Sequence, residues 1–242
     1  IASNRALPDS FFEDMILKAP SKDIMNKLGR SVLALYSYDE NPENRSPEYE
    51  MATAISIISK LPTIMVDAYQ VKRRCYDNET MFMHPLDKNH STAEMILSTL
   101  RADRKFTHEE AKLLDLLLML HAEHGGGNNS TFACRVLTSS GTDAYSAYSA
   151  AIGALKGPRH GGANKKVVEM QECIKRNVKN GNDEGEVADF LRKILRKEEN
   201  DHSGLIYGMG HAVYTLSDPR AVILKEEARK FAEKEGMMDD FN

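Results

Sequence analysis

Apolar residues recur along most of the chain every three or four positions, the spacing that places them on one face of an α-helix. The spacing is clear after Ser21, a candidate N-cap. It is also clear in the segment that opens at Ser46-Pro47, where proline suits the first helical position. Pro62 lies inside this second segment and is expected to break or kink it. We find no convincing strand pattern and no internal repeat. The pattern therefore predicts an all-α fold.

The segment that follows Thr107 is apolar nearly all round. Thr107 is a candidate N-cap, and Glu109 and Glu110 lie in the first turn, where carboxylates suit the positive end of a helix. Leucine dominates from Leu113 to Leu120. Because a helix without a polar face is normally enclosed, we predict that this helix is buried in the core. It should end in the glycine-rich turn after His124.

A glycine-proline pair, Gly157-Pro158, is the best candidate for a domain boundary. We therefore predict a large helical domain over residues 1–156 and a smaller helical domain over residues 157–242, each of them part of a longer domain. Three helices are expected in the second part, at 163–179, at 184–197 and from Asp218-Pro219 onward.

The composition is that of a soluble globular protein: 242 residues, 41% hydrophobic, 28% charged, with a formal net charge of −4. Lysine and arginine form no basic cluster, so nucleic acid is not an expected partner. The longest apolar run, Leu116–Leu120, is far shorter than the roughly 20 residues that span a bilayer, so no membrane partner is expected. No signal peptide is visible, and Ile1 is not a start methionine, so the natural N-terminus is expected to be absent.

Metal and disulfide chemistry are not indicated. Cys75, Cys134 and Cys173 are widely spaced and form no CxxC pair, which disfavours a zinc or disulfide framework and fits a reducing compartment. His121 and His124 lie in an HAEH segment, which lacks the i, i+4 histidine spacing of a zinc helix. We expect no metal site, and His121 could equally be a structural residue at a helix end.

Three histidines lie beside glycines. His124 precedes three glycines and Asn128, His160 lies in GPRHGGAN, and His211 lies in GMGHAV with Arg220 nine residues further on. Glycine permits sharp turns and close approach of a ligand. Histidine can hydrogen-bond a carbonyl that gains charge during a reaction, and arginine can hold a carboxylate through two hydrogen bonds. The pattern predicts a site for a small dicarboxylate, although a single glycine-flanked histidine is more often a turn residue.

The order HAEH-GGGN, GPRHGGAN and GMGHAVY…DPR resembles the citrate synthase family. The spacing also matches, with 36 residues from His124 to His160 and 51 from His160 to His211. The resemblance covers nearly the whole chain and is strongest from Leu113 to Arg220. It implies an all-helical homodimer in which a large and a small domain close over the substrates.

The resemblance also implies roles for individual residues. His160 would hydrogen-bond the thioester carbonyl of acetyl-CoA as it enolises, and His211 would hold and protonate the ketone oxygen of oxaloacetate. Ser130 would support the first of these histidines. The implied substrate-binding set is His124, Asn128, Ser130 and Arg220. The implied contacts to CoA are Leu205, Ile206, Gly208 and Gly210.

The implied activity is that of an acyltransferase of the tricarboxylic acid cycle. It condenses acetyl-CoA with oxaloacetate and water through an enol(ate) thioester, giving citrate and CoA. No cofactor is implied, because the CoA thioester is a substrate. The family's catalytic aspartate lies well beyond the DPR motif, and Asp239 and Asp240 lie too close to Arg220 to fill that role. The chain is therefore expected to be truncated at both ends and inactive by itself. Thr215 stands where relatives often carry a basic residue near the CoA phosphates.

Alternatives remain open at this point. A 2-methylcitrate synthase, which uses propionyl-CoA, shares these motifs. A non-catalytic relative that binds CoA or a dicarboxylate would also explain why the catalytic aspartate is absent from these residues. A purely structural helical scaffold leaves the three glycine-flanked histidines unexplained. The expected location is the cytoplasm, as in bacteria, with the mitochondrial matrix left open because the N-terminus is expected to be missing.

Overall fold

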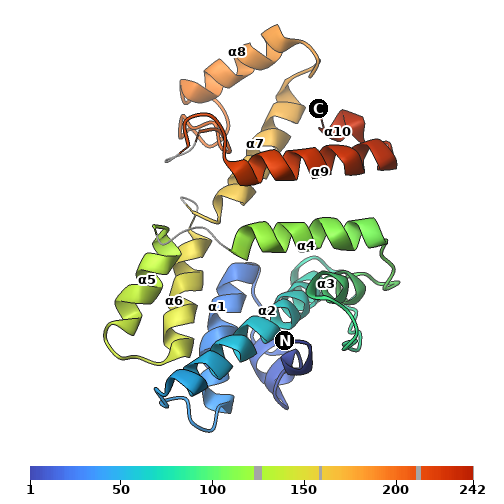
Figure 1. Cartoon of the computed structure of the whole chain (residues 1–242). Coiled ribbons are helices and arrows are strands. Elements are labelled where there is room, and N and C mark those ends of the chain that lie inside the picture. Colours follow the sequence, from blue (N-terminus) through green and yellow to red (C-terminus); the bar gives the residue numbers. More distant parts are fainter. Residues whose placement is uncertain (123–126, 158–159, 211–213, 242) are drawn as a thin grey trace. The chain divides into compact units, whose positions relative to one another are not determined.

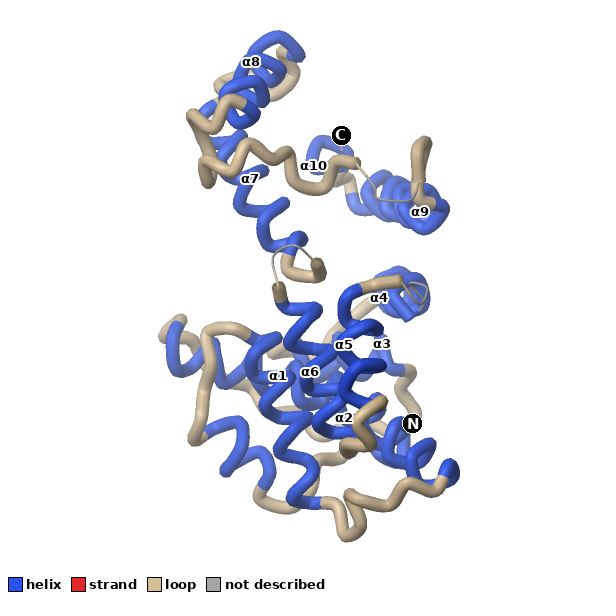
Figure 2. Tube along the Cα trace, turned by 90° about the vertical axis from the view of Figure 1, so that its left-hand side faces the viewer, coloured by secondary structure: helices blue, strands red, loops and turns tan. Residues whose placement is uncertain are grey.

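The computed structural model describes residues 1–122, 127–157, 160–210 and 214–241, and within these ranges the regular structure is entirely helical (Figures 1 and 2). This confirms the all-α prediction. The longer helices are α1 (Ile24–Ala34), α2 (Pro47–Tyr76), α3 (Thr92–Leu100), α4 (His108–Ala122), α5 (Asn129–Thr138), α6 (Ala144–Lys156), α7 (Ala163–Asn177), α8 (Glu184–Leu195) and α9 (Pro219–Glu235). The short helices are η1 (Ala2–Asn4), η2 (Phe12–Leu17), η3 (Leu35–Tyr38) and α10 (Met238–Phe241).

The chain divides into two compact units. The first contains Ile1–Ala154 and Pro219–Asn242, and the second contains Leu155–Asp218. This grouping differs from the predicted division at 156/157 in its last segment, because α9 packs against α4 of the first unit. The division into two folding domains remains a prediction.

The core of the first unit forms where α1 and η2 pack against α2 and η3 packs against α1. The largest buried cluster consists of Phe11, Ile16, Val32, Leu35, Ile57, Ile64, Ala68, Val71 and Tyr145. Small residues allow α6 to approach α1 closely: the Ser149 hydroxyl donates to the Gly29 carbonyl oxygen at 2.9 Å. A Cβ atom at Gly29 would lie 3.6 Å from the Ser149 carbonyl oxygen, an ordinary van der Waals contact.

Helix α2 runs through Pro62 without a break, so the expected break is wrong, while the alternative expectation of a kink stays a prediction. Buried residues on both sides of the proline, including Ile57 and Ile64, hold the helix in the core and outweigh the lost backbone hydrogen bond. Among the described residues, α2 is also long and apolar enough to cross a membrane by length and composition alone, with 39% of its most apolar window buried. A core helix has the same features, and the absence of a membrane partner stays a prediction.

The helix starts agree with the sequence in one case and differ in another. Thr107 caps α4 as predicted: its hydroxyl accepts from the Glu110 N–H at 3.2 Å, and the Glu110 carboxylate accepts from the Thr107 N–H at 2.7 Å. Ser21 does not cap α1. The cap is Asp23, whose carboxylate accepts from the Asn26 N–H at 2.7 Å, while the Ser21 hydroxyl accepts from the Asp23 N–H.

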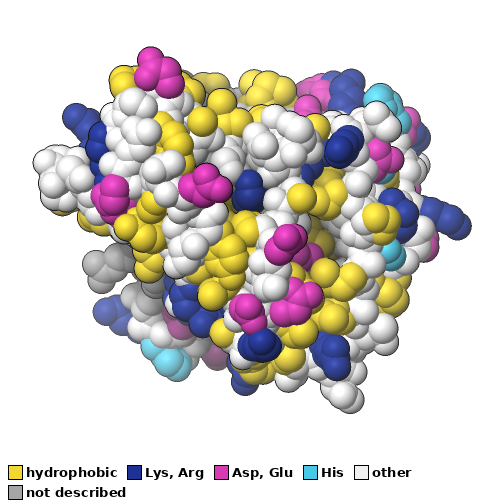
Figure 3. All heavy atoms as spheres, turned by 90° about the horizontal axis from the view of Figure 1, so that it is seen from below, with side chains coloured by type: hydrophobic (Ala, Val, Ile, Leu, Met, Phe, Trp, Pro, Cys, Tyr) yellow, Lys and Arg dark blue, Asp and Glu magenta, His cyan; other side chains and the backbone are white. Residues whose placement is uncertain are grey.

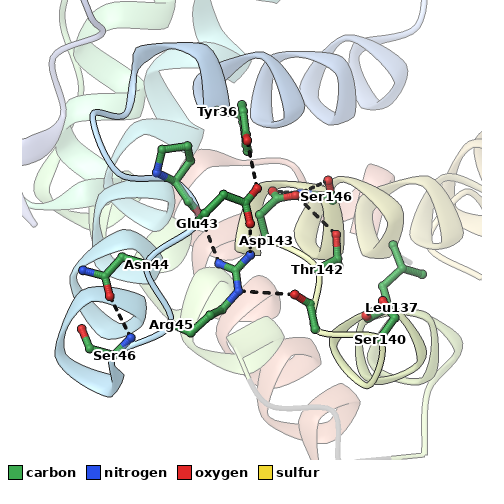
Figure 4. Close-up of polar contacts among 12 residues, drawn as sticks. Tyr36, Glu43, Asn44, Arg45, Ser46, Leu137, Ser140, Thr142, Asp143 and Ser146 are labelled. Atoms are coloured by element: carbon green, nitrogen blue, oxygen red, sulfur yellow. Dashed lines mark hydrogen bonds and ion pairs between the residues drawn. The ribbon is translucent and has the colours of Figure 1, made fainter.

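Polar side chains join the turn before α2 to the turn before α6 (Figure 4). The Arg45 guanidinium pairs with Glu43 at 2.7 Å and donates to the carbonyl oxygen of Gly141. Asp143 then caps α6, because its carboxylate accepts from both the N–H and the hydroxyl of Ser146. These contacts fix the start of α6, the helix that leads to the second unit.

Helix α4 is not enclosed, and this prediction was wrong. Ala111 is buried and Leu114 packs near α2 and α3, but Leu118 and Met119 are 38% and 62% exposed. Helices α3 and α9 each pack against α4, and within the described part of the chain several of its leucines remain only half-buried. Elsewhere on the molecule, hydrophobic side chains also reach the surface between charged ones, as the face in Figure 3 shows.

Candidate active site

The predicted site residues fall in both units. His124 and His211 lie outside the described residues, so their predicted roles are untested. Asn128, Ser130 and Arg220 belong to the first unit. His160 and the predicted CoA contacts belong to the second. The geometry of each set is described separately.

His160 lies in a tight turn that leads into α7. The His160 and Gly162 N–H groups both donate to the Gly157 carbonyl oxygen, at 2.9 and 3.2 Å, and the Ala163 N–H donates to the His160 carbonyl oxygen at 2.9 Å. A Cβ atom at Gly161 would lie 2.9 Å from the carbonyl oxygen of Leu155. The turn therefore requires glycine after the histidine, and it leaves the His160 side chain exposed to solvent.

The requirement is stricter at Gly162, where a Cβ atom would lie 2.5 Å from the Lys156 carbonyl oxygen. That separation is shorter than any ordinary contact between a carbon and an oxygen atom. The backbone at Gly162 thus lies too close to the Lys156 carbonyl oxygen for any side chain at position 162. The HGG sequence reflects close packing of the turn as well as access for a ligand.

The predicted CoA contacts lie against the same helix. Gly208 has φ of +82°, and a Cβ atom there would lie 3.1 Å from Cγ2 of Val167 in the first turns of α7. Gly210 has φ of +86°. Both glycines adopt the left-handed conformation that side chains disfavour. Leu205 and Met209 are 56% and 77% exposed, so this segment presents backbone and apolar side chains to solvent.

A small core holds the segment in place. Met170 and Cys173 of α7 pack with Phe190 and Ile194 of α8, and Ile206 and Tyr207 pack against this cluster. Within the second unit, the structure therefore brings the His160 turn and the Leu205–Gly210 segment to the first turns of one helix, α7, although 45 positions separate His160 from Leu205 in the sequence.

In the first unit, Asn128 and Ser130 interact with each other. Asn128 is the N-cap of α5: its side-chain oxygen accepts from the Thr131 N–H at 2.8 Å and from the Ser130 hydroxyl at 2.6 Å. The Ser130 hydroxyl thus donates to Asn128 here, and its predicted support of a histidine stays a prediction. Arg220 follows Pro219 in the first turn of α9, where the DPR motif starts the helix as expected.

The sequence did not single out three residues that bind the Leu205–Gly210 segment to α7, namely Lys166, Asp201 and Tyr207. Each looks like an ordinary surface residue when read alone. Among the described residues, no group of three or more histidine, cysteine or acidic side chains could hold a metal ion, and the absence of a metal stays a prediction. The cysteine thiols are free.

Comparisons with known proteins give a consistent result. The family model described as "Citrate synthase, C-terminal domain" matches residues 1–242. The citrate synthase of Deinococcus radiodurans is 33% identical over 238 residues, which are 98% of this chain and 57% of that protein. The citrate synthase of Acidithiobacillus ferridurans is 39% identical over 190 residues, 78% of this chain and 41% of that protein. The chain spans about half the length of the curated relatives that it matches.

Solved structures agree on the fold. The crystal structure of citrate synthase from Pyrobaculum aerophilum matches with a TM-score of 0.73 and 28% identity, covering 97% of this chain and 56% of that one. The citrate synthase of the thermophilic archaeon Thermoplasma acidophilum, solved as a ternary complex with carboxymethyl coenzyme A and oxaloacetate, matches with a TM-score of 0.74 and 24% identity, covering 100% of this chain and 58% of that one.

Proposed function

The chain belongs to the citrate synthase family, and from that premise we propose that it carries the histidine-containing part of a citrate synthase. The proposed reaction condenses acetyl-CoA with oxaloacetate and water to give citrate and CoA. The observation that supports it most directly is the placement of the His160 turn and the Leu205–Gly210 segment on the first turns of α7.

The chemistry assigns a separate task to each group. A base removes a proton from the methyl group of acetyl-CoA while the neutral imidazole of His160 donates a hydrogen bond to the thioester oxygen, where negative charge develops. The resulting enol(ate) carbon attacks the ketone carbon of oxaloacetate and forms the new C–C bond. His211 gives its proton to the ketone oxygen, and water then cleaves the thioester and releases CoA.

We assign the base to an aspartate that a longer chain supplies beyond Asn242, so the 242 residues alone are proposed to be inactive. Binding of oxaloacetate is assigned to four residues of the chain. Arg220 can hold a carboxylate through two hydrogen bonds, and the others offer neutral donors and acceptors. This proposed set is His124, Asn128, Ser130 and Arg220. No cofactor or metal is needed for the reaction as written.

We further propose that the protein is a homodimer. Large apolar side chains are exposed on both α4 and α5: Leu118, Met119, Phe132 and Val136 are 38%, 62%, 66% and 49% exposed. Exposed large apolar side chains are a common feature of interfaces with another chain. The proposed location is the cytoplasm of a bacterial-type cell, with the mitochondrial matrix as the alternative.

The experiment measures oxaloacetate-dependent release of CoA thiol from acetyl-CoA and from propionyl-CoA. It compares the 242-residue chain with a longer chain that carries these residues within the full length of its relatives. The proposal expects release from acetyl-CoA by the longer chain and none by the 242 residues alone. Faster release from propionyl-CoA would identify a 2-methylcitrate synthase. Release from neither, with CoA still bound, would identify a non-catalytic relative.

A further inference from the structure

Asp201 lies at the centre of a polar network that joins the segment after α8 to α7. One carboxylate oxygen accepts from the Tyr207 hydroxyl at 2.7 Å and lies 3.3 Å from the Lys166 ammonium, while the other accepts from the Ser203 N–H at 3.2 Å. Hydrogen bonds from Ser203 and Tyr207, with a further contribution from Lys166, hold the pKa of Asp201 well below its usual range. The carboxylate is therefore ionised throughout the neutral range. Lys166, Asp201, Ser203 and Tyr207 are called the Asp201 network below.

The network surrounds the predicted CoA contacts. The Ser203 hydroxyl accepts from the Leu205 N–H at 3.2 Å, so the backbone is fixed where that segment begins. Tyr207 adjoins Gly208, which lies against Val167, the residue next to Lys166. Polar contacts and close packing thus act on the same short stretch of α7. The turn that presents His160 leads directly into that stretch.

We propose that Lys166 and Asp201 are positioning residues for the CoA thioester, acting through Tyr207 to hold the Leu205–Gly210 backbone against α7 before the ligand binds. This inference rests on the proposed function, which makes the segment a CoA contact. The physical reason is preorganisation. A segment that contains two glycines with positive φ has many alternative conformations, and ordering it during binding would weaken the affinity.

For Asp201→Asn, simple electrostatics and positioning predict changes in CoA affinity of opposite sign. CoA is an anion, so Asp201→Asn removes a like charge and would tighten CoA binding if the network only contributed charge. Positioning predicts weaker binding, because the neutral amide loses the ion pair with Lys166 and is a poorer acceptor for Tyr207. Glu169→Gln is the matched control. Glu169 also pairs with Lys166, at 3.2 Å, but it lies on α7, and within the described residues its ion pairs are with Lys165 and Lys166 of the same helix.

The test is isothermal titration of the 242-residue chain with CoA. Asp201→Asn and Tyr207→Phe are each expected to raise Kd by roughly five- to tenfold, and the double variant by no more than the larger single effect. Glu169→Gln should leave Kd within about twofold, and Lys166→Arg, which keeps the charge, should retain more affinity than Lys166→Met. Tighter binding by Asp201→Asn, or equal effects of Asp201→Asn and Glu169→Gln, would overturn the proposal.

Hydrogen exchange separates failure of this inference from failure of the proposed function. In Asp201→Asn, amides of residues 203–208 should exchange faster while those of α8 stay protected. Unchanged exchange across 203–208 would overturn the positioning role even if CoA binds. If the wild-type chain does not bind CoA, the CoA assignment of the segment fails, and faster exchange in the variant would then show only that the network orders the chain.

Discussion

Replacing Asp67 with asparagine is expected to stabilise the chain above neutral pH and to remove one component of the dependence of stability on pH. Asp67 lies in α2 and, with Val66, Phe82 and His84 among others, lines a cavity of about 420 Å³. Among the described residues, no hydrogen bond or ion pair to this carboxyl group is recorded. Burial alone raises the pKa of Asp67 to about 7.

The direction of the effect follows from proton linkage. The unfolded chain loses the Asp67 proton near the ordinary value of 3.8, whereas the folded chain keeps it until about pH 7. Between these values the folded state binds more protons, so the free energy of unfolding falls as pH rises from about 4 to about 7 and then levels off. This difference between the folded and unfolded pKa values corresponds to at most about 4 kcal/mol. The open cavity admits water, so we expect about 2–4 kcal/mol at pH 8.

Urea unfolding followed by circular dichroism at pH 5 and pH 8 measures this difference. Asp67→Asn should be more stable than wild type at pH 8, and its advantage should shrink by about 1–2.5 kcal/mol at pH 5, where folded wild-type Asp67 is already neutral. Asp115→Asn, which changes an exposed aspartate on α4, is the control and should show no such change between the two pH values. An advantage for Asp67→Asn that is the same at both pH values would refute the reasoning.

The remaining predictions concern the turn, the dimer and a helix cap. Gly162→Ala should lower both the melting temperature and turnover of the longer chain, because its Cβ atom would meet the Lys156 carbonyl oxygen. Gly153→Ala is the matched control: its Cβ atom would meet open space, so it should stabilise α6 by about 0.5–1 kcal/mol in the same melting assay. Met119→Glu should convert the proposed dimer to monomer in analytical ultracentrifugation without unfolding α4, since the side chain is 62% exposed within one chain; a persisting dimer would place the interface elsewhere. Thr107→Ala should cost about 1 kcal/mol in urea unfolding, and no loss would mean that the cap is dispensable.

Local sequence rules were sufficient where a helix start or a glycine turn depends on neighbouring residues. The sequence predicted three such features: the cap at Thr107, the helix start at Pro219 and the glycine turn after His160. Each depends on contacts within a few positions. Pro62 shows the limit of these rules. Its local cost is real, but burial of α2 residues on both sides keeps the helix continuous, and that burial depends on segments far away in the sequence.

Features that depend on distant partners could not be read from the sequence. The apolar pattern of α4 predicted burial but could not say whether the covering surface belongs to the same chain, and Leu118 and Met119 remain exposed. Lys166 and Asp201 are separated by 35 positions, and neither is unusual in its local context. The ion pair between them forms because Ile206 and Tyr207 pack against the cluster that α7 and α8 share.

In the proposed reaction, the His160 turn presents the histidine to a CoA thioester. The most direct measurement compares oxaloacetate-dependent release of CoA thiol from acetyl-CoA by wild type, His160→Ala and His202→Ala, all in the longer chain. His202 is an exposed histidine of the same unit whose ring nitrogen contacts the Lys197 carbonyl oxygen, so it controls for loss of a histidine as such. We expect turnover to fall by roughly two to three orders of magnitude in His160→Ala and to change little in His202→Ala. Equal turnover by wild type and His160→Ala would contradict it.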